Sequence, residues 1–113
     1  MSVHSDVEED WPLGMGLWVM PDGEVVVRLR GDLDICSAEQ AFRYVGDMID
    51  RCRGRVLVDL SGVNYCDAVG LRTLALMCNY ADHSGCLLEL VAPSDSLLKV
   101  MKITGLDFKS HMF

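Results

Sequence analysis

The chain has 113 residues, of which 50% are hydrophobic, and a formal net charge of −7. A chain of this length forms one domain, and its apolar content argues against intrinsic disorder. The acidic balance argues against nucleic-acid binding through phosphate contacts, and no apolar run approaches the ~20 residues that a membrane-spanning helix needs.

The first twelve residues contain four acidic side chains and no Lys or Arg. This composition predicts a flexible acidic tail at residues 1–12 and places the folded domain at residues 13–113. The same stretch lacks the basic and then apolar pattern of a secretory signal peptide, so we expect a cytoplasmic protein.

Two apolar runs, residues 17–20 and 25–29, flank a Pro-Asp-Gly turn and predict a β-hairpin. Residues 31–34 are expected to form a loop. Ser37 and Gln40 fit a capping box at the start of a helix that ends near Gly54. Apolar residues recur along this helix at helical spacing and define its buried stripe: Ala41, Phe42, Val45, Met48, Ile49 and Cys52.

The second half of the chain alternates strands and helices. Residues 56–60 predict a central strand buried on both faces, and a short turn should follow it. A helix is expected from about residue 69 to residue 84, with Asp67 as its N-cap and Gly85 closing it. Residues 86–91 predict a further strand, residues 94–105 a third helix, and residues 106–113 a last short strand. The core should include Leu57, Leu74, Leu88 and Leu90.

This order of elements predicts an α/β fold with a four- to five-stranded mixed sheet. We expect the helices mainly on one face, because the first hairpin adds strands without supplying a helix.

Motifs for metal binding and catalysis are missing from the sequence. The five cysteines are odd in number and contain no Cys-x-x-Cys pair, so buried free thiols are expected rather than a zinc site or a disulfide framework. The three histidines are dispersed, and no phosphate-binding Gly-rich loop is present. We therefore expect no catalytic residues, no metal and no cofactor.

Two motifs carry a resemblance to a known family. Residues 59–71 read Asp-Leu-Ser-Gly-Val-Asn-Tyr-Cys-Asp-Ala-Val-Gly-Leu, and residues 26–34 read Val-Val-Arg-Leu-Arg-Gly-Asp-Leu-Asp. They resemble the signature segments of the STAS domain family, the fold of bacterial anti-sigma factor antagonists. Asp32 stands where that family more often has Glu. A weaker match covers the strand that follows Gly85, Pro93 and the helix after it, so the resemblance spans about residues 17–110.

The resemblance implies a regulatory binding protein rather than an enzyme. In small members of the family, the unphosphorylated antagonist captures an anti-sigma factor, usually a kinase, and phosphorylation of a serine after the motif's Asp ends the capture. Here that position is Ala68, which has no hydroxyl group. The implied partner is an anti-sigma factor or a serine-protein-kinase-like protein, without nucleic acid or membrane insertion. The implied partner-binding residues are Asp32, Asp34, Asp67, Ala68, Val69, Gly70 and Arg72.

Several alternatives remain open from the sequence. The chain could be a STAS subunit of a larger complex, such as a lipid ABC transporter or a stressosome-like assembly, or a small enzyme. Asp67 could serve mainly as a helix cap. Asp32 and Asp34 could be ordinary loop acids. Ser61 at a strand end and Thr73 on a helix surface are the nearest hydroxyl groups that could replace the missing phosphorylation site. Cys66 could be a redox sensor with a lowered pKa, although a core thiol is the simpler interpretation.

Overall fold

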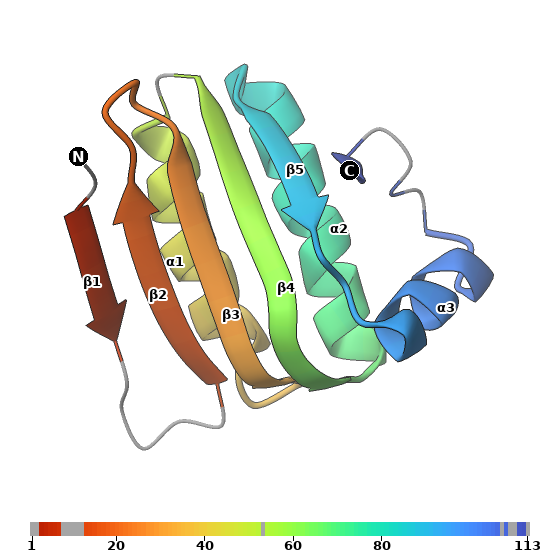
Figure 1. The fold of residues 1–113 in the computed structure, drawn as a ribbon. Coiled ribbons are helices and arrows are strands. Elements are labelled where there is room, and N and C mark those ends of the chain that lie inside the picture. Colours follow the sequence, from red (N-terminus) through yellow and green to blue (C-terminus); the bar gives the residue numbers. More distant parts are fainter. Residues whose placement is uncertain (1–2, 8–12, 53, 107, 109–110, 113) are drawn as a thin grey trace.

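Eight elements make up the fold of the computed structural model, which describes residues 3–7, 13–52, 54–106, 108 and 111–112 (Figure 1). In chain order they are strands β1 (Val3–Val7), β2 (Leu13–Val19) and β3 (Val25–Leu33), helix α1 (Ala38–Asp50), strand β4 (Arg55–Cys66), helix α2 (Ala68–Ser84), strand β5 (Leu87–Val91) and helix α3 (Asp95–Ile103).

The five strands form one mixed sheet in the order β1-β2-β3-β4-β5. β1, β2 and β3 pair antiparallel, whereas β3 pairs parallel with β4, and β4 parallel with β5. Each parallel pair is joined through a helix, as parallel crossovers require. β4 is therefore an interior strand, and the predicted mixed α/β sheet is confirmed.

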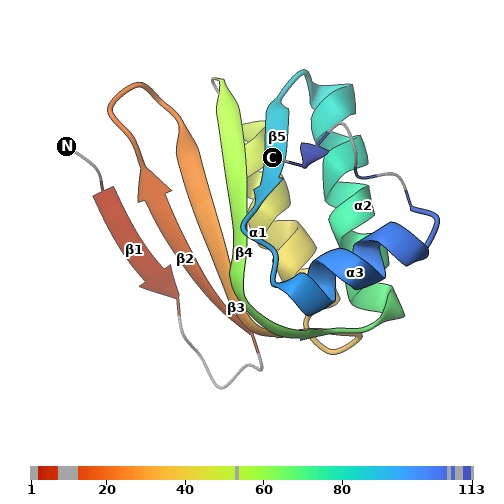
Figure 2. The same ribbon diagram turned by 45° about the vertical axis from the view of Figure 1, so that its right-hand side comes forward.

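The helices lie on one face of the sheet, as predicted (Figure 2). Burial along β4 consequently alternates: Val56, Val58 and Leu60 are fully buried against the helices, while Leu57 on the opposite face is only half-buried. The expectation that residues 56–60 are buried on both faces is wrong, and so is the placement of Leu57 in the core, because the helices of the described residues all lie on the other face. Leu74, Leu88 and Leu90 are buried as expected.

The acidic N-terminal segment departs from its prediction. Residues 3–7, expected to belong to a flexible tail, form the edge strand β1, whose residues Val3 to Val7 pair with Val19 to Met15 of β2. Composition suggested a tail because charge dominates this stretch, but the backbone of an edge strand needs a partner on only one side.

The hairpin of β2 and β3 around residues 21–23 is confirmed. Both parallel strands continue further than the sequence suggested. β3 runs through the expected loop as far as Leu33, and β4 runs through the expected turn as far as Cys66. Their register shifts between Arg28 and Arg30 and again between Gly31 and Asp32. Because of these irregularities, the strands can include residues that are typical of turns, such as Gly31 and Gly62.

The predicted helices are confirmed with small changes at their ends. Ala41, Val45 and Ile49 of the α1 stripe are buried, while Phe42, Met48 and Cys52 pack at its margin. α1 ends at Asp50, somewhat earlier than expected. α2 begins after the Asp67 cap and ends at Gly85, which has the left-handed conformation (φ 74°) that glycine adopts readily.

One cysteine pair contradicts the expectation of free thiols. Cys52 and Cys86 form a disulfide, with 6.0 Å between their Cα atoms and a sequence separation of 34 residues. The other three cysteines are free. Spacing along the chain could not reveal this pair, because the segments that follow α1 and α2 meet only when both helices lie side by side on the sheet.

Candidate functional site

The candidate site lies at the edge of the sheet where the parallel strands end, at the lower edge in Figure 1. Asp34 follows the end of β3 and Asp67 follows the end of β4. All three helices begin at this edge, so their free backbone N–H groups and the positive ends of their dipoles gather there. In open α/β sheets this is also the edge where ligands bind most often.

Asp67 joins the starts of two helices. Its Oδ1 accepts a hydrogen bond from the backbone N–H of Gly70 at 2.8 Å, which caps α2 as predicted. Its Oδ2 accepts from the backbone N–H of Ile35 at 3.1 Å, in the loop that precedes α1. Both carboxylate oxygens are therefore engaged within the chain, and the role of this side chain is in the first place structural.

Asp34 stabilises the loop before α1 in a similar way. Its Oδ1 accepts from the backbone N–H of Cys36 at 2.9 Å and of Ser37 at 3.2 Å. Ser37 precedes the helix as predicted, but it forms no capping box: its hydroxyl group donates to the backbone oxygen of Asp32 at 2.8 Å and accepts from the N–H of Asp34. The carboxylate of Asp34 thus faces its own loop, and this geometry favours an ordinary structural role.

Asp32 belongs to β3, where it pairs with Tyr65 of β4, and its side chain is half-buried. It is therefore a strand residue rather than the loop residue that the sequence suggested.

The first turn of α2 presents three of the predicted residues to solvent: Ala68, Val69 and Arg72 are exposed. Gly70 is different, since it is buried. A Cβ atom at this position would lie 2.1 Å from the backbone oxygen of Leu33 and 2.9 Å from Sγ of Cys66. Gly70 therefore allows the close approach of α2 to the end of β3, and it offers nothing directly to a partner.

A shallow groove of about 510 Å³ adjoins this turn, between α2 and the end of α3. Its lining comes from two distant parts of the chain: Ala68, Val69, Leu71, Arg72, Thr104 and Leu106. Ile35, which is 71% exposed, is held by its backbone N–H to the carboxylate of Asp67, the residue before Ala68, and Ile103 at the end of α3 is 74% exposed. We call Ile35, Ala68, Val69, Arg72, Thr104 and Leu106 the α2-start surface.

Sequence reasoning found half of this surface and missed Ile35, Thr104 and Leu106. Nothing in the sequence around these three residues signals a site. In the sequence, Ile35 looks like any apolar core residue. Only its 71% exposure in the structure distinguishes it from one.

The two other hydroxyl groups are poor substitutes for a phosphorylation site. Thr73, expected on the helix surface, is in fact buried at 6% exposure. Ser61 is exposed, but it lies within β4, and its N–H donates to the carboxylate of Asp59 at 2.9 Å. Six residues, Gly62 to Asp67, separate it from Ala68.

The thiol of Cys66 lies beside the α2 start but is not activated by it. Burial, followed by the negative charge of Asp67, raises the pKa of this thiol to about 12. A thiol with a raised pKa is protonated at neutral pH and reacts slowly. The geometry thus supports a packing role, and a redox sensor with a lowered pKa is contradicted.

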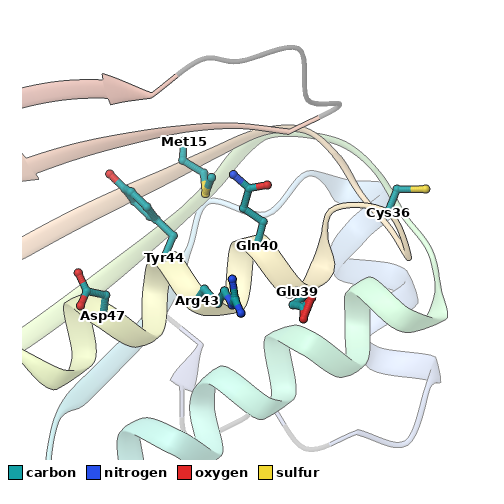
Figure 3. A pocket seen from close by; sticks show the side chains of 7 residues that line it. All are labelled: Met15, Cys36, Glu39, Gln40, Arg43, Tyr44 and Asp47. Carbon is teal, nitrogen blue, oxygen red and sulfur yellow. The ribbon is translucent and has the colours of Figure 1, made fainter.

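A larger hollow of about 690 Å³ lies beside α1, on the side of Met15 in β2 (Figure 3). Met15 from β2 faces Tyr44 and Gln40 from α1 there, whereas Cys36 lies off at the start of the helix. The charged residues that line it, Glu39, Arg43 and Asp47, are all exposed on α1. It contains none of the predicted site residues.

Within the described ranges, no His, Cys, Asp and Glu side chains gather in a group of three or more that could hold a metal ion. None of the helices in the described part of the chain combines the length and apolar character needed to span a bilayer.

Similarities to known proteins agree with this architecture. The profile of the family described as "Mlab, STAS domain" matches residues 19–109. Among solved structures, the anti-sigma factor antagonist SpoIIAA of Bacillus is similar in its unphosphorylated form, with a TM-score of 0.65, 20% identity, and coverage of 88% of this chain and 86% of SpoIIAA. A putative anti-sigma factor antagonist of Thermotoga maritima gives a TM-score of 0.68 at 23% identity, covering 85% and 82%.

The fold also occurs within a much larger chain. The murine anion transporter Slc26a9 matches with a TM-score of 0.71 and 20% identity over 100% of this chain, which corresponds to 21% of the transporter.

The α/β fold of this chain, a mixed sheet with helices on one face, is the fold that these anti-sigma factor antagonists share. The chain belongs to the STAS domain family.

Proposed function

We propose that this protein is a regulatory binding protein of the anti-sigma factor antagonist kind, which captures a kinase-type anti-sigma factor through the α2-start surface. The observation that carries the proposal is the exposure of Ala68 in the first turn of α2, directly after the Asp67 cap. In the family, this position usually bears the serine whose phosphorylation ends partner capture.

The chemistry of the α2-start surface supports a protein partner. Val69 and Leu106 expose apolar side chains in the same groove as the small methyl group of Ala68, and Ile35 exposes a further apolar side chain. Arg72 adds a charged margin. Apolar side chains with a polar rim are the usual composition of a protein interface. The groove is too open and too poor in converging polar groups for a small-molecule site.

The alanine determines how such a protein would be regulated. A methyl group cannot accept a phosphoryl group, so the kinase activity of a captured partner would not release this antagonist at position 68. Thr73 is buried and Ser61 lies in a strand, so the start of α2 has no exposed hydroxyl group. Thr104 of the α2-start surface is exposed, but it lies at the end of α3, where its Oγ1 donates to the backbone oxygen of Met101 at 3.1 Å. Binding would then be set by the amounts of the two proteins rather than by phosphorylation.

A separate observation supports a second function. The match to a segment of Slc26a9 shows this fold inside a transporter chain, where the domain makes up a minor part of the protein. A STAS subunit of a larger complex, such as a lipid ABC transporter or a stressosome-like assembly, would also need no phosphorylatable serine.

Binding measurements with matched charge substitutions test the proposal. Ala68→Glu places a carboxylate in the expected contact and should weaken binding to a kinase-type anti-sigma factor by tenfold or more, about 1.4 kcal/mol. Leu87→Glu is the control, because Leu87 is 67% exposed at the start of β5, at the opposite end of the sheet. Equal loss in both variants, or none in Ala68→Glu, would place the contact elsewhere.

Affinity capture from the native cytoplasm distinguishes the two functions. A soluble protein with a kinase fold among the captured partners supports the antagonist, whereas a membrane ATPase supports the transporter subunit.

A further inference from the structure

The disulfide between Cys52 and Cys86 joins the segments that follow α1 and α2. Cys52 comes directly after the C-cap residue of α1, and Cys86 comes directly after Gly85, the C-cap of α2. The backbone supports the same junction, since the N–H of Leu87 donates to the oxygen of Gly54 at 3.3 Å. The bridge therefore holds both helices to the start of β5.

The C-terminal ends of α1 and α2, which the bridge joins, lie opposite to the α2-start surface, near the top in Figure 1. At the other end, the Asp67 carboxylate links the starts of the same two helices through the N–H of Ile35. Between the two links, α1 and α2 contact each other, and Tyr80 of α2 donates a hydrogen bond to Asp50 of α1 and packs edge-on against Phe42. The helix pair is thus fastened at both ends, once covalently and once by a hydrogen bond.

We propose that Cys52 and Cys86 are a reversible dithiol–disulfide couple, and that its oxidation state sets how firmly α1 and α2 are held together, up to the loop of Ile35 at the far end. This inference is independent of the proposed partner, because it concerns the free protein.

The exposure of the two sulfur-bearing residues indicates how the couple reacts. Cys52 is half-buried, whereas Cys86 is 5% exposed. A thiolate from a small thiol or a dithiol protein would attack Sγ of Cys52, form a mixed disulfide there and release the thiolate of Cys86, which takes up a proton. A second thiol then attacks the mixed disulfide, leaves Cys52 as a thiol and departs as the oxidised reductant. A small-molecule disulfide acts in the reverse direction and is reduced to two thiols.

The remaining cysteines are poor competitors in this exchange. Burial is the main reason that the pKa values of Cys66 and Cys78 rise to about 12, so both thiols are protonated at neutral pH. Cys36 is exposed at the start of α1, at the opposite end of the helix from Cys52.

Thiol counting on the wild-type chain tests the couple first. Protein prepared without reductant and unfolded in an alkylating reagent should carry three labels, on Cys36, Cys66 and Cys78, and five labels after treatment with dithiothreitol. Glutathione disulfide should re-form the bridge in the refolded, reduced protein, so that Cys52 and Cys86 lose their labels and are found joined in one disulfide-linked peptide. Five labels that persist with excess glutathione disulfide would overturn the proposal.

Measurements of thermal stability and amide exchange test the effect of the couple on the helix pair. Reduction should lower Tm by an amount on the order of 10 °C, because the bridge closes a loop of about 34 residues in the unfolded chain. The N–H of Ile35 should exchange about threefold faster or more in the reduced protein. The N–H of Met20, which donates to the oxygen of Glu24 in the β2–β3 turn at 2.8 Å, is the reference and should not change. An equal change at both amides, or none at Ile35, would overturn the coupling between the two ends.

Two variants separate the bridge from general thiol effects. Cys86→Ser should give a Tm that dithiothreitol no longer alters, whatever its starting value. Cys36→Ser should keep the full response to dithiothreitol, because Cys36 is a free thiol outside the bridge. A Cys86→Ser protein that still responds to dithiothreitol as the wild type does would contradict the assignment.

Discussion

The carboxylate of Asp67 accepts a hydrogen bond from the backbone N–H of Ile35, although the two residues are 32 positions apart in the chain. The same carboxylate caps α2 through Gly70. One side chain thus positions the start of α2 against the loop before α1, between Ile35 and Ala68 of the α2-start surface. An Asp at this position has two acceptor oxygens for two donors, which Ser or Thr would not provide.

Removing this carboxylate should therefore destabilise the fold more than removing an ordinary helix cap. Asp67→Ala loses both hydrogen bonds and should lower the free energy of unfolding by about 2–3 kcal/mol. Ser94→Ala is the comparison, since Ser94 caps α3 through a single bond from the N–H of Leu97 at 3.2 Å, and it should lose about 1 kcal/mol. Urea unfolding of the two variants measures the difference, and equal losses would show that the Ile35 bond contributes nothing.

Gly70 should tolerate no side chain. In Gly70→Ala the new methyl group would meet the backbone oxygen of Leu33, which cannot move without displacing β3, so we expect a loss of about 3 kcal/mol or failure to fold. Gly54→Ala is the matched control, because no atom lies within 4 Å of a Cβ built there. Thermal unfolding of both variants checks the prediction, and two similar midpoints would contradict the close approach of α2 to β3.

The burial of one face of α2 predicts opposite outcomes for two leucines in the same helix. Leu74 is fully buried, so Leu74→Ala should lower the free energy of unfolding by about 2–5 kcal/mol. Leu76 is 48% exposed, and Leu76→Ala should change it by about 0.5 kcal/mol or less. Denaturant titration compares them directly. A melting curve unchanged by Leu74→Ala would mean that the buried face of α2 is assigned wrongly.

Phosphorylation provides a test of the α2 start itself. Incubation with ATP and a kinase-type anti-sigma factor should leave residues 60–75 of the natural protein unmodified, as judged by intact-mass and peptide mass spectrometry. Ala68→Ser restores an exposed hydroxyl group in the first turn of α2 with little added volume, and this variant should gain one phosphate. Stoichiometric phosphate on Ser61 or Thr73 of the natural protein would refute a non-phosphorylatable antagonist.

The buried thiols predict a loss of stability at high pH. Burial raises the pKa of Cys78 to about 12, whereas the unfolded chain releases this proton near pH ~8.5. The folded state therefore binds the thiol proton more tightly than the unfolded chain does. The contribution of this proton to stability is complete below about pH 8.5 and disappears as the pH rises towards 12. The Tm of the natural protein should fall from pH 7 to pH 11. The Tm of Cys78→Ala should fall less steeply over this range than the Tm of Cys36→Ser. Parallel curves for these two variants would speak against the buried thiol.

Much of this fold could be predicted from local signals. The Pro-Asp-Gly turn between two apolar runs fixed the hairpin, and the Asp67 cap, the apolar spacing of α2 and Gly85 defined that helix almost to the residue. These signals are local because turns, caps and helical stripes depend on residues a few positions apart. The predictions went wrong where a strand passes through residues typical of turns, as at Gly31 and Gly62, since pairing with a neighbouring strand outweighs local propensity there.

The sequence by itself determined the alternation of strands and helices, the position of Ala68 after a capping Asp, and the burial of Leu74 on α2. Only the tertiary structure decided which face of β4 is covered, that residues 3–7 form an edge strand, and that Gly70 is buried against Leu33. It decided as well that Leu106 lines one groove with Ala68 and that Ile35 is hydrogen-bonded to Asp67. It also decided that Cys52 meets Cys86. The reason is physical: all of these depend on which distant segments the sheet places side by side, and neither residue spacing nor local propensity contains that information.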